Sequence, residues 1–208
     1  PKLMERKVDR ENNRIEVVLR YEDFDFDSRV VVEPKADGFE VTVLLDEPLP
    51  ARLEGRTGFN LEFLPSAYFE KTYLVDGKPG IFPLYPSGPM SVLPAETQIP
   101  QFGGHSTFDD RGRGEYVEPR PIEVGRKLIL APEDPERRVE IESEGADLML
   151  FDGRNVAQNG WFVVRTLIPA QSTGRVVQWH VKPHTIAGWK RSPVIAFSQV
   201  GYHPGQKK

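Results

Sequence analysis

The sequence predicts an all-β protein: a large two-sheet antiparallel β-sandwich with a long Pro/Gly-rich loop. Three observations lead to this fold class. Apolar residues recur at every second position in most segments, turn sequences typical of hairpins separate the segments, and no segment carries a sustained helical stripe. About ten strands at hairpin spacing imply two packed antiparallel sheets.

The clearest alternating segments are Phe39–Asp46, Arg138–Glu142 and Arg175–Lys182. Each has apolar side chains on one face and polar or charged side chains on the other, with Leu44 the exception in the first segment. Successive strand residues point to opposite faces, so we expect half-buried antiparallel strands here. The other predicted strands are, in chain order, Arg14–Arg20, Arg29–Glu33, Gly58–Leu64, Lys127–Leu130, Leu148–Phe151 and Trp161–Ile168.

Four short sequences between these segments supply the glycine-containing turns that hairpins need. They are Ala36-Asp37-Gly38, Val75-Asp76-Gly77-Lys78, Glu144-Gly145-Ala146 and Phe151-Asp152-Gly153. The segment from Asp76 to Pro121 differs, because it contains eight prolines and many glycines. Proline cannot donate a backbone hydrogen bond, so this segment is predicted to be a long loop and not central sheet.

Composition excludes several classes of function. A formal net charge of −4 gives no electrostatic reason to expect nucleic acid or an anionic membrane as partner. No apolar run approaches the roughly 20 residues that span a bilayer. The absence of cysteine rules out disulfides, thiolate catalysis and cysteine-based zinc sites. No cofactor is predicted.

The alternation of Asp23, Asp25 and Asp27 with phenylalanines has two interpretations. Several carboxylates could bind calcium, but an EF-hand loop starting at Asp23 would need Gly and Glu where Ser28 and Pro34 stand. The alternative is a strand with its aspartates in water and its phenylalanines inward. The period of two favours this strand, so no metal site is predicted.

No catalytic residue is assigned. The sequence lacks the GxSxG and HExxH motifs of serine and zinc hydrolases. The acidic pairs Glu133-Asp134 and Asp109-Asp110 lie beside proline or glycine and are interpreted as solvated turn carboxylates. The four histidines are interpreted as surface or structural residues; they are His105, His180, His184 and His203.

Aromatic residues provide the candidate ligand-binding side chains. Trp161 and Trp179 lie in strongly apolar strands, so we expect both to be buried. Trp189 is flanked by polar residues and is expected to be partly exposed. The candidate ligand-binding residues are Trp189, Tyr85 and Phe102, the last two from the long loop.

The segment Phe197–Pro204, FSQVGYHP, resembles the first strand of the immunoglobulin-like domain that precedes the catalytic barrel in family nine glycoside hydrolases. The upstream segments Gly58–Phe69 and Gln158–Phe162 resemble an additional N-terminal module of some such enzymes, notably bacterial ones. The resemblance covers nearly the whole chain. It implies a β-sandwich module over residues 1–197, with 198–208 beginning an immunoglobulin-like module or forming a tail.

The resemblance implies a hydrolase parent, active on cellulose or related β-glucans, and a noncatalytic fragment. The family's aspartate pair and glutamate lie on a downstream α/α barrel, and none of them matches a position in this chain. The expected function is structural support of the catalytic region. The alternatives are a carbohydrate-binding module for a β-glucan-type polysaccharide and a stand-alone β-sandwich enzyme.

The expected partners are the downstream immunoglobulin-like and catalytic modules, with polysaccharide as a further one. The resemblance also implies a secreted, periplasmic or cell-surface location. The chain ends in an apolar run and a turn, which favours a longer natural polypeptide.

Overall fold

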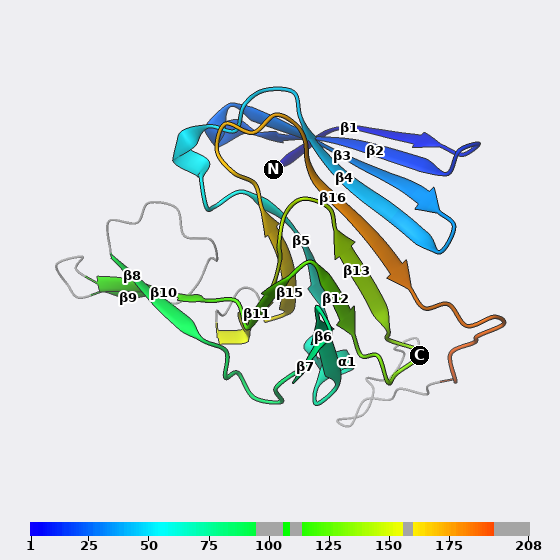
Figure 1. Cartoon of the computed structure of the whole chain (residues 1–208). Coiled ribbons are helices and arrows are strands. Elements are labelled where there is room, and N and C mark those ends of the chain that lie inside the picture. The colour runs from blue at the N-terminus through cyan, green and yellow to red at the C-terminus, as the bar shows by residue number, and fades with distance from the viewer. Residues whose placement is uncertain (95–105, 109–113, 156–159, 194–208) are drawn as a thin grey trace, which may run out of the picture.

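The computed structural model describes residues 1–94, 106–108, 114–155 and 160–193 (Figure 1). Its described part is built almost entirely from antiparallel strands, with three short 3-10 helices and one single-turn helix, α1 (Pro65–Tyr68). The predicted all-β antiparallel fold class is therefore confirmed. No helix within the described ranges is long and apolar enough to cross a membrane.

The larger sheet contains nine strands, and all its neighbouring pairs are antiparallel. Across the sheet they are β1 (Lys2–Asp9), β2 (Arg14–Tyr21), β3 (Phe26–Lys35), β4 (Gly38–Leu45), β16 (Gly174–Pro183), β13 (Val139–Ser143), β12 (Lys127–Leu130), β6 (Thr72–Val75) and β7 (Lys78–Ile81).

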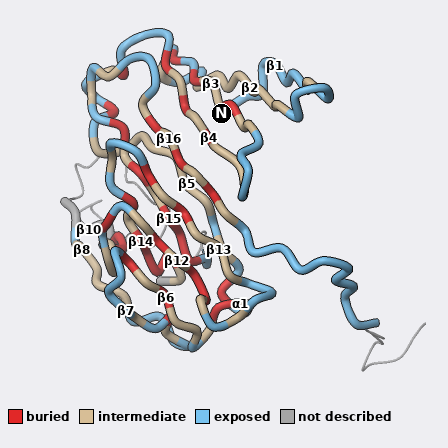
Figure 2. The backbone as a smooth tube through the Cα atoms, turned by 45° about the vertical axis from the view of Figure 1, so that its right-hand side comes forward, coloured by how far each residue is buried: buried red, intermediate tan, exposed pale blue. Residues whose placement is uncertain are grey.

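A smaller sheet packs against the middle of the larger one. Its four strands, in spatial order, are β11 (Glu123–Gly125), β14 (Leu148–Asp152), β15 (Phe162–Leu167) and β5 (Gly58–Phe63). Figure 2 shows the buried residues concentrated along the strands where the two sheets face each other. Because the larger sheet has nine strands and the smaller one has four, the outer strands of the larger sheet extend beyond the smaller sheet.

The core between the sheets contains a buried tryptophan that forms a hydrogen bond from the larger sheet to the smaller one. Trp179 on β16 is 0% exposed, and its Nε1 donates to Thr166 Oγ1 on β15 at 3.0 Å. Thr166 Oγ1 in turn donates to the backbone oxygen of Asp147 at 2.8 Å. Both buried polar groups are therefore satisfied, which removes the free-energy penalty of burying them.

All nine predicted strands are present, with ends that differ by a few residues. The inward positions on β16 and β4 are also as predicted. Their side chains are almost fully buried: Val177, Trp179 and Val181 on β16, and Val41, Val43 and Leu45 on β4.

The predicted long loop is only partly a loop. Strand β7 pairs with β6 at the edge of the larger sheet, where Pro79 costs no central ladder bond. Further along, β8 (Met90–Pro94), β10 (Gly114–Pro119) and β9 (Ser106–Phe108) form a separate three-stranded sheet that projects from the sandwich (Figure 1). The prolines therefore did not exclude strands: Pro79 lies in the edge strand β7, and Pro119 is the last residue of β10.

Two local predictions were wrong. Residues Glu22–Phe24 form a 3-10 helix, and Asp25 has a left-handed φ of 50°, so the chain turns before β3 begins. The acidic residues are nevertheless exposed and Phe26 is buried, as expected. The Glu144-Gly145-Ala146 turn does not close a hairpin: β13 pairs with β12 and β16, and the chain then crosses to β14 in the smaller sheet.

A buried ion pair ties the smaller sheet to the edge of the larger one. Arg154 Nε and Nη2 donate to the two carboxylate oxygens of Asp152, each at 2.8 Å. The same guanidinium donates to the backbone oxygens of Pro83 and Leu84 at 2.8 Å. The Asp152 side chain is 0% exposed and that of Arg154 is 9% exposed, and the guanidinium lies over the Phe162 ring at 4.7 Å.

We predict that Arg154→Met lowers the free energy of unfolding by about 3–5 kcal/mol, because it leaves the Asp152 carboxylate buried without its counter-charge. The measurement is chemical denaturation monitored by tryptophan fluorescence. Arg126→Met is the matched control, since its pair with Asp147 is exposed at both ends and contributes at most about 1 kcal/mol. Equal losses in the two variants would contradict the prediction.

Candidate functional site

A shallow groove lies beside Trp189, at the end of the larger sheet where the chain leaves β16. Its volume is about 330 Å³. One wall comes from the turn between β12 and β13, and the other from the segment after β16. The residues that line it are Pro135, Glu136, His184, Thr185, Ile186 and Trp189.

Asp134 organises the β12–β13 turn. Its carboxylate contacts Lys71 Nζ and Arg137 Nη1, both at 2.8 Å, and accepts the backbone N–H of Glu136 at 2.9 Å. The hydrogen bond from Lys71, supported by Arg137, outweighs burial and lowers the pKa of Asp134 from 3.8 to about 2. Glu133 also holds the turn, since its Oε1 accepts the backbone N–H of Thr72 at 2.8 Å.

The segment after β16 is fixed to this turn by three hydrogen bonds. The backbone N–H of His184 donates to the Arg138 oxygen at 3.0 Å, and His184 Nδ1 lies 2.8 Å from the Pro135 oxygen. A carbonyl can only accept, so Nδ1 carries the proton. Trp189 Nε1 donates to Glu136 Oε1 at 3.1 Å.

The anchored indole keeps an open face. Trp189 is 51% exposed and Ile186 is 38% exposed, so apolar surface faces solvent between polar neighbours. The hydrogen bond from its N–H to Glu136 orients the ring. Such an arrangement can stack on a flat apolar face of a ligand, while His184, Thr185 and Glu136 supply hydrogen-bonding groups at the rim.

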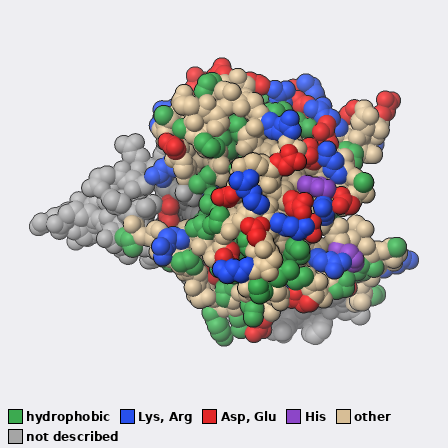
Figure 3. Space-filling view, in the orientation of Figure 1, with side chains coloured by type: hydrophobic (Ala, Val, Ile, Leu, Met, Phe, Trp, Pro, Cys, Tyr) green, Lys and Arg blue, Asp and Glu red, His purple; other side chains and the backbone are tan. Residues whose placement is uncertain are grey.

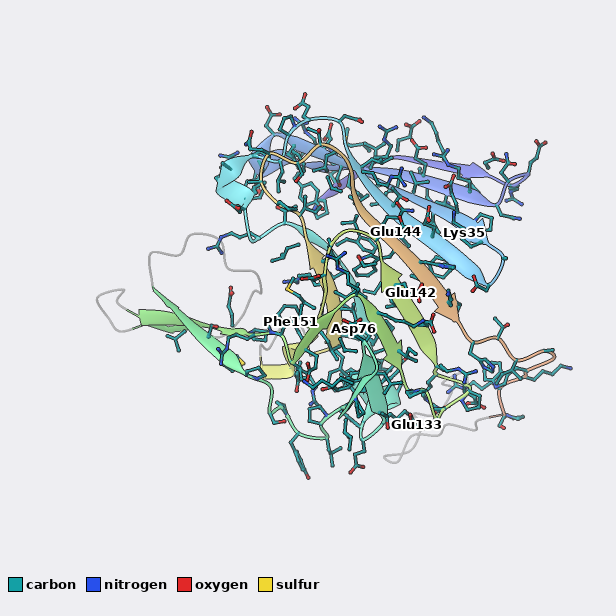
Figure 4. All side chains as sticks on the ribbon, in the orientation of Figure 1. Lys35, Asp76, Glu133, Glu142, Glu144 and Phe151 are labelled. Carbon is teal, nitrogen blue, oxygen red and sulfur yellow. The ribbon has the colours of Figure 1, made fainter. Side chains whose placement is uncertain are left out.

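The broad outer face of the larger sheet carries charged side chains that neutralise one another. Lys127 Nζ lies 2.9 Å from Glu140 and 2.6 Å from Glu142, and Lys182 lies 3.2 Å from Glu140. Hydrogen bonds to Glu142 and Glu140 raise the pKa of Lys127. Figure 3 shows both signs of charge intermingled, and Figure 4 labels Glu142 on β13 and Lys35 at the end of β3, both in the larger sheet. This cross-strand pairing stabilises a sheet surface and leaves no concentrated charge for a ligand.

Of the three predicted ligand-binding residues, the structure describes Trp189 and Tyr85. Trp189 lines the groove. Tyr85 is 77% exposed and lies outside it, in the segment that Arg154 holds. Phe102 lies outside the described residues. Sequence reasoning missed Glu136, because nothing in one sequence distinguishes it among 31 acidic residues.

Three other predictions about side chains need correction or remain open. Trp161 is 37% exposed and not buried, since it precedes β15, whereas Trp179 is buried as predicted. Glu133 and Asp134 are structural carboxylates that hold a turn and not merely solvated ones. Other candidates fall outside the described residues: Asp109, Asp110, His105 and His203.

Three further observations concern side chains outside the groove. Within the described ranges, no group of three or more histidine, aspartate or glutamate side chains is placed to hold a metal ion. His180 Nε2 lies 3.0 Å from Asp37 Oδ1 on the charged face, apart from the groove. A second hollow, of about 150 Å³, is lined mainly by apolar side chains around Phe24 and Leu53.

Comparisons with known proteins identify no family. The sequence matches no protein-family profile and no curated protein. Among solved structures, the crystal structure of the Slr1438 protein from Synechocystis sp. PCC 6803 is similar, with a TM-score of 0.34 and 10% sequence identity. The similarity covers 88% of this chain and 65% of that one. A likeness this weak assigns neither family nor function.

We predict that Asp134 makes stability acid-sensitive. Its pKa is depressed on folding, so its contribution is fully present above pH 3.8 and is lost as pH falls toward 2. Because solvent screens part of the interaction, we expect Asp134→Asn to cost about 1–2 kcal/mol near neutral pH. Urea denaturation of both proteins at several pH values measures this.

The two stability curves should converge as pH approaches 2. Asp23→Asn is the control, because it alters an exposed carboxylate in the same way. A constant difference between wild type and Asp134→Asn at every pH would show that the variant disturbs the turn sterically.

Proposed function

We propose that this chain is a noncatalytic recognition module that binds a ligand with a flat apolar ring face over Trp189. The half-exposed indole, oriented by its hydrogen bond to Glu136, carries the proposal. A binding platform needs an aromatic ring that is both open to solvent and fixed in direction. Trp189 meets both conditions, whereas Trp179 is enclosed in the core.

A sugar ring of a polysaccharide is the ligand class that fits this groove best. One face of a pyranose is a patch of C–H groups that packs on an indole, while its hydroxyls need hydrogen-bonding partners at the edge. His184, Thr185 and Glu136 line the groove together with Trp189 and can supply such partners. The resemblance of Phe197–Pro204 to family nine glycoside hydrolases supports a β-glucan as the polymer, and with it a secreted, periplasmic or cell-surface location.

The groove is poorly equipped for hydrolysis. Glycosidases of the common kind use two carboxyl groups on opposite sides of the scissile bond. Of the described residues that line the groove, Glu136 is the one carboxylate, and it is engaged with the indole N–H. Recognition without cleavage is therefore the better-supported role.

Structural support of a neighbouring catalytic region is the second candidate. Ile186 and Trp189 present adjacent apolar surface just before the segment that resembles an immunoglobulin-like strand. A following module could cover these side chains instead of a sugar. Both candidates use the same patch, and one experiment separates them.

We predict that the protein migrates more slowly in native gels containing soluble β-glucan than in gels without it. Trp189→Ala should abolish the retardation, because stacking on an aromatic ring is the main contact. Trp189→Phe should retain part of it. Tyr85→Ala is the matched control, since Tyr85 is highly exposed but lies outside the groove.

Absence of retardation for the wild type would reject glycan binding and favour the supporting role. Retardation that Tyr85→Ala removes and Trp189→Ala leaves intact would place the binding site elsewhere.

A further inference from the structure

Strand β1 is an exposed edge of the larger sheet. In the part of the chain that the structure describes, β2 is its one neighbouring strand, and Figure 2 shows β1 exposed along nearly its whole length. Three of its apolar side chains are open to solvent: Leu3 at 57%, Met4 at 55% and Val8 at 46%. A free edge presents unpaired backbone N–H and C=O groups, which is a template for another strand.

The register of β1 assigns its side chains to the two faces of the sheet. Leu3 pairs with Leu19 and Val8 with Ile15, and from Ile15 the same face continues through Val32 to the buried Val41. Leu3, Arg6 and Val8 therefore share the inner face. A bulge at Met4 shifts the alternation, so that the outer face carries Lys2, Glu5, Lys7 and Asp9.

The smaller sheet does not cover this end of the inner face. The apolar residues Ile15, Val17 and Leu19 of β2 are only half-buried, and they do not belong to the main core cluster. Together with Leu3 and Val8 they extend the apolar face of the sheet to its open edge. A partner that continues the sheet would cover both the edge and this strip.

The side chains of β1 are complementary to β1 itself in antiparallel orientation. We propose that a second copy of this chain pairs along β1, with a two-fold axis at Arg6. Glu5 then lies opposite Lys7 of the second copy, on the outer face. Beyond the bulges, Val8 lies opposite Leu3 of the second copy on the inner face, and Asp9 lies opposite its Lys2 on the outer face.

Each of these pairs occurs twice because of the two-fold symmetry. Opposite charges meet on the outer face and apolar side chains meet on the inner face, which are the cross-strand pairs that stabilise a sheet. The exception is Arg6, which faces its own copy at the axis. This like-charge pair weakens the association, but the other cross-strand pairs of the proposed register remain complementary.

Other registers lose this complementarity. Sliding the second copy by two residues in one direction places Glu5 opposite Asp9 and Lys7 opposite Lys7. Sliding it in the other direction places Glu5 opposite Glu5 and Lys7 opposite Lys2. Both slides create like-charge pairs on the outer face, so the charges select the register centred on Arg6.

Charged residues and bulges on edge strands usually prevent pairing. Here the alternating signs match a second copy, so they direct pairing to one partner. The opposite edge of the same sheet is protected differently: β7 contains Pro79, which cannot donate a ladder hydrogen bond. We therefore expect the β7 edge to resist pairing with another strand and the β1 edge to pair with a second copy.

Cysteine scanning tests the register directly, because the chain has no cysteine of its own. Directly opposed residues of antiparallel strands have Cα atoms about 4.5–5.5 Å apart, within disulfide reach. Arg6→Cys should therefore form a disulfide-linked dimer under mild oxidation, seen by non-reducing electrophoresis. Glu5→Cys alone and Lys7→Cys alone should not, because their copies lie diagonally, about 7–8 Å apart.

A mixture of the Glu5→Cys and Lys7→Cys proteins should cross-link, since these positions are opposed in the proposed register. This result would also show that both variants still associate. Failure of Arg6→Cys and of the mixture to cross-link would overturn the proposal, as would cross-linking of Glu5→Cys alone.

Sedimentation velocity of the unmodified protein provides the second measurement. We expect a concentration-dependent monomer–dimer equilibrium. Arg6→Thr should tighten dimerisation about two- to fivefold, because it removes the like-charge pair at the axis. A wild-type protein that stays monomeric at its highest soluble concentration, or an Arg6→Thr variant that dimerises more weakly, would overturn the proposal. Neither measurement depends on glycan binding.

Discussion

The fold depends on one interaction, the pairing of the buried carboxylate of Asp152 with a positive charge. Asp152 ends β14 at 0% exposure, and an ionised carboxylate is not stable there without a counter-charge. Arg154 supplies the charge, and its remaining donors are satisfied by Pro83 and Leu84. The guanidinium thereby ties the end of the smaller sheet to the chain that leaves β7, at the edge of the larger sheet.

This tie reaches the groove through packed aromatic rings and one hydrogen bond. Phe82, next to the tied segment, lies 4.5 Å from Phe162 and 5.7 Å from Tyr68 between ring centroids. Tyr68 Oη donates to the backbone oxygen of Arg137 at 3.0 Å, within the turn that positions Glu136. The orientation of the groove's tryptophan therefore rests on a continuous set of contacts that begins in the core.

The alternation of apolar and polar residues predicted the strands that bury one face in the core. It failed where a bulge or a contact between distant residues determines the structure. The alternation in Val177–Val181 predicts a strand correctly, because every second residue of this segment enters the core. Strand β1 is not predicted, since its bulge interrupts the period of two and none of its residues is buried. In the groove, Trp189 was identified from its polar neighbours. Glu136 was not, because its role comes from a turn that brings it beside a residue 53 positions away.

The difference in size between the sheets explains where this molecule presents surface to partners. The four strands of the smaller sheet cover only the middle of the nine-stranded sheet. The apolar face at both ends of the larger sheet must therefore be covered in another way. At the β7 end, the chain buries Phe82 directly after the strand, and Arg154 binds the backbone oxygens of the next two residues, Pro83 and Leu84. At the β1 end, nothing among the described residues plays this part, and the apolar face continues to the open edge. A second copy paired along β1 would complete the sheet at the edge that the described residues leave open.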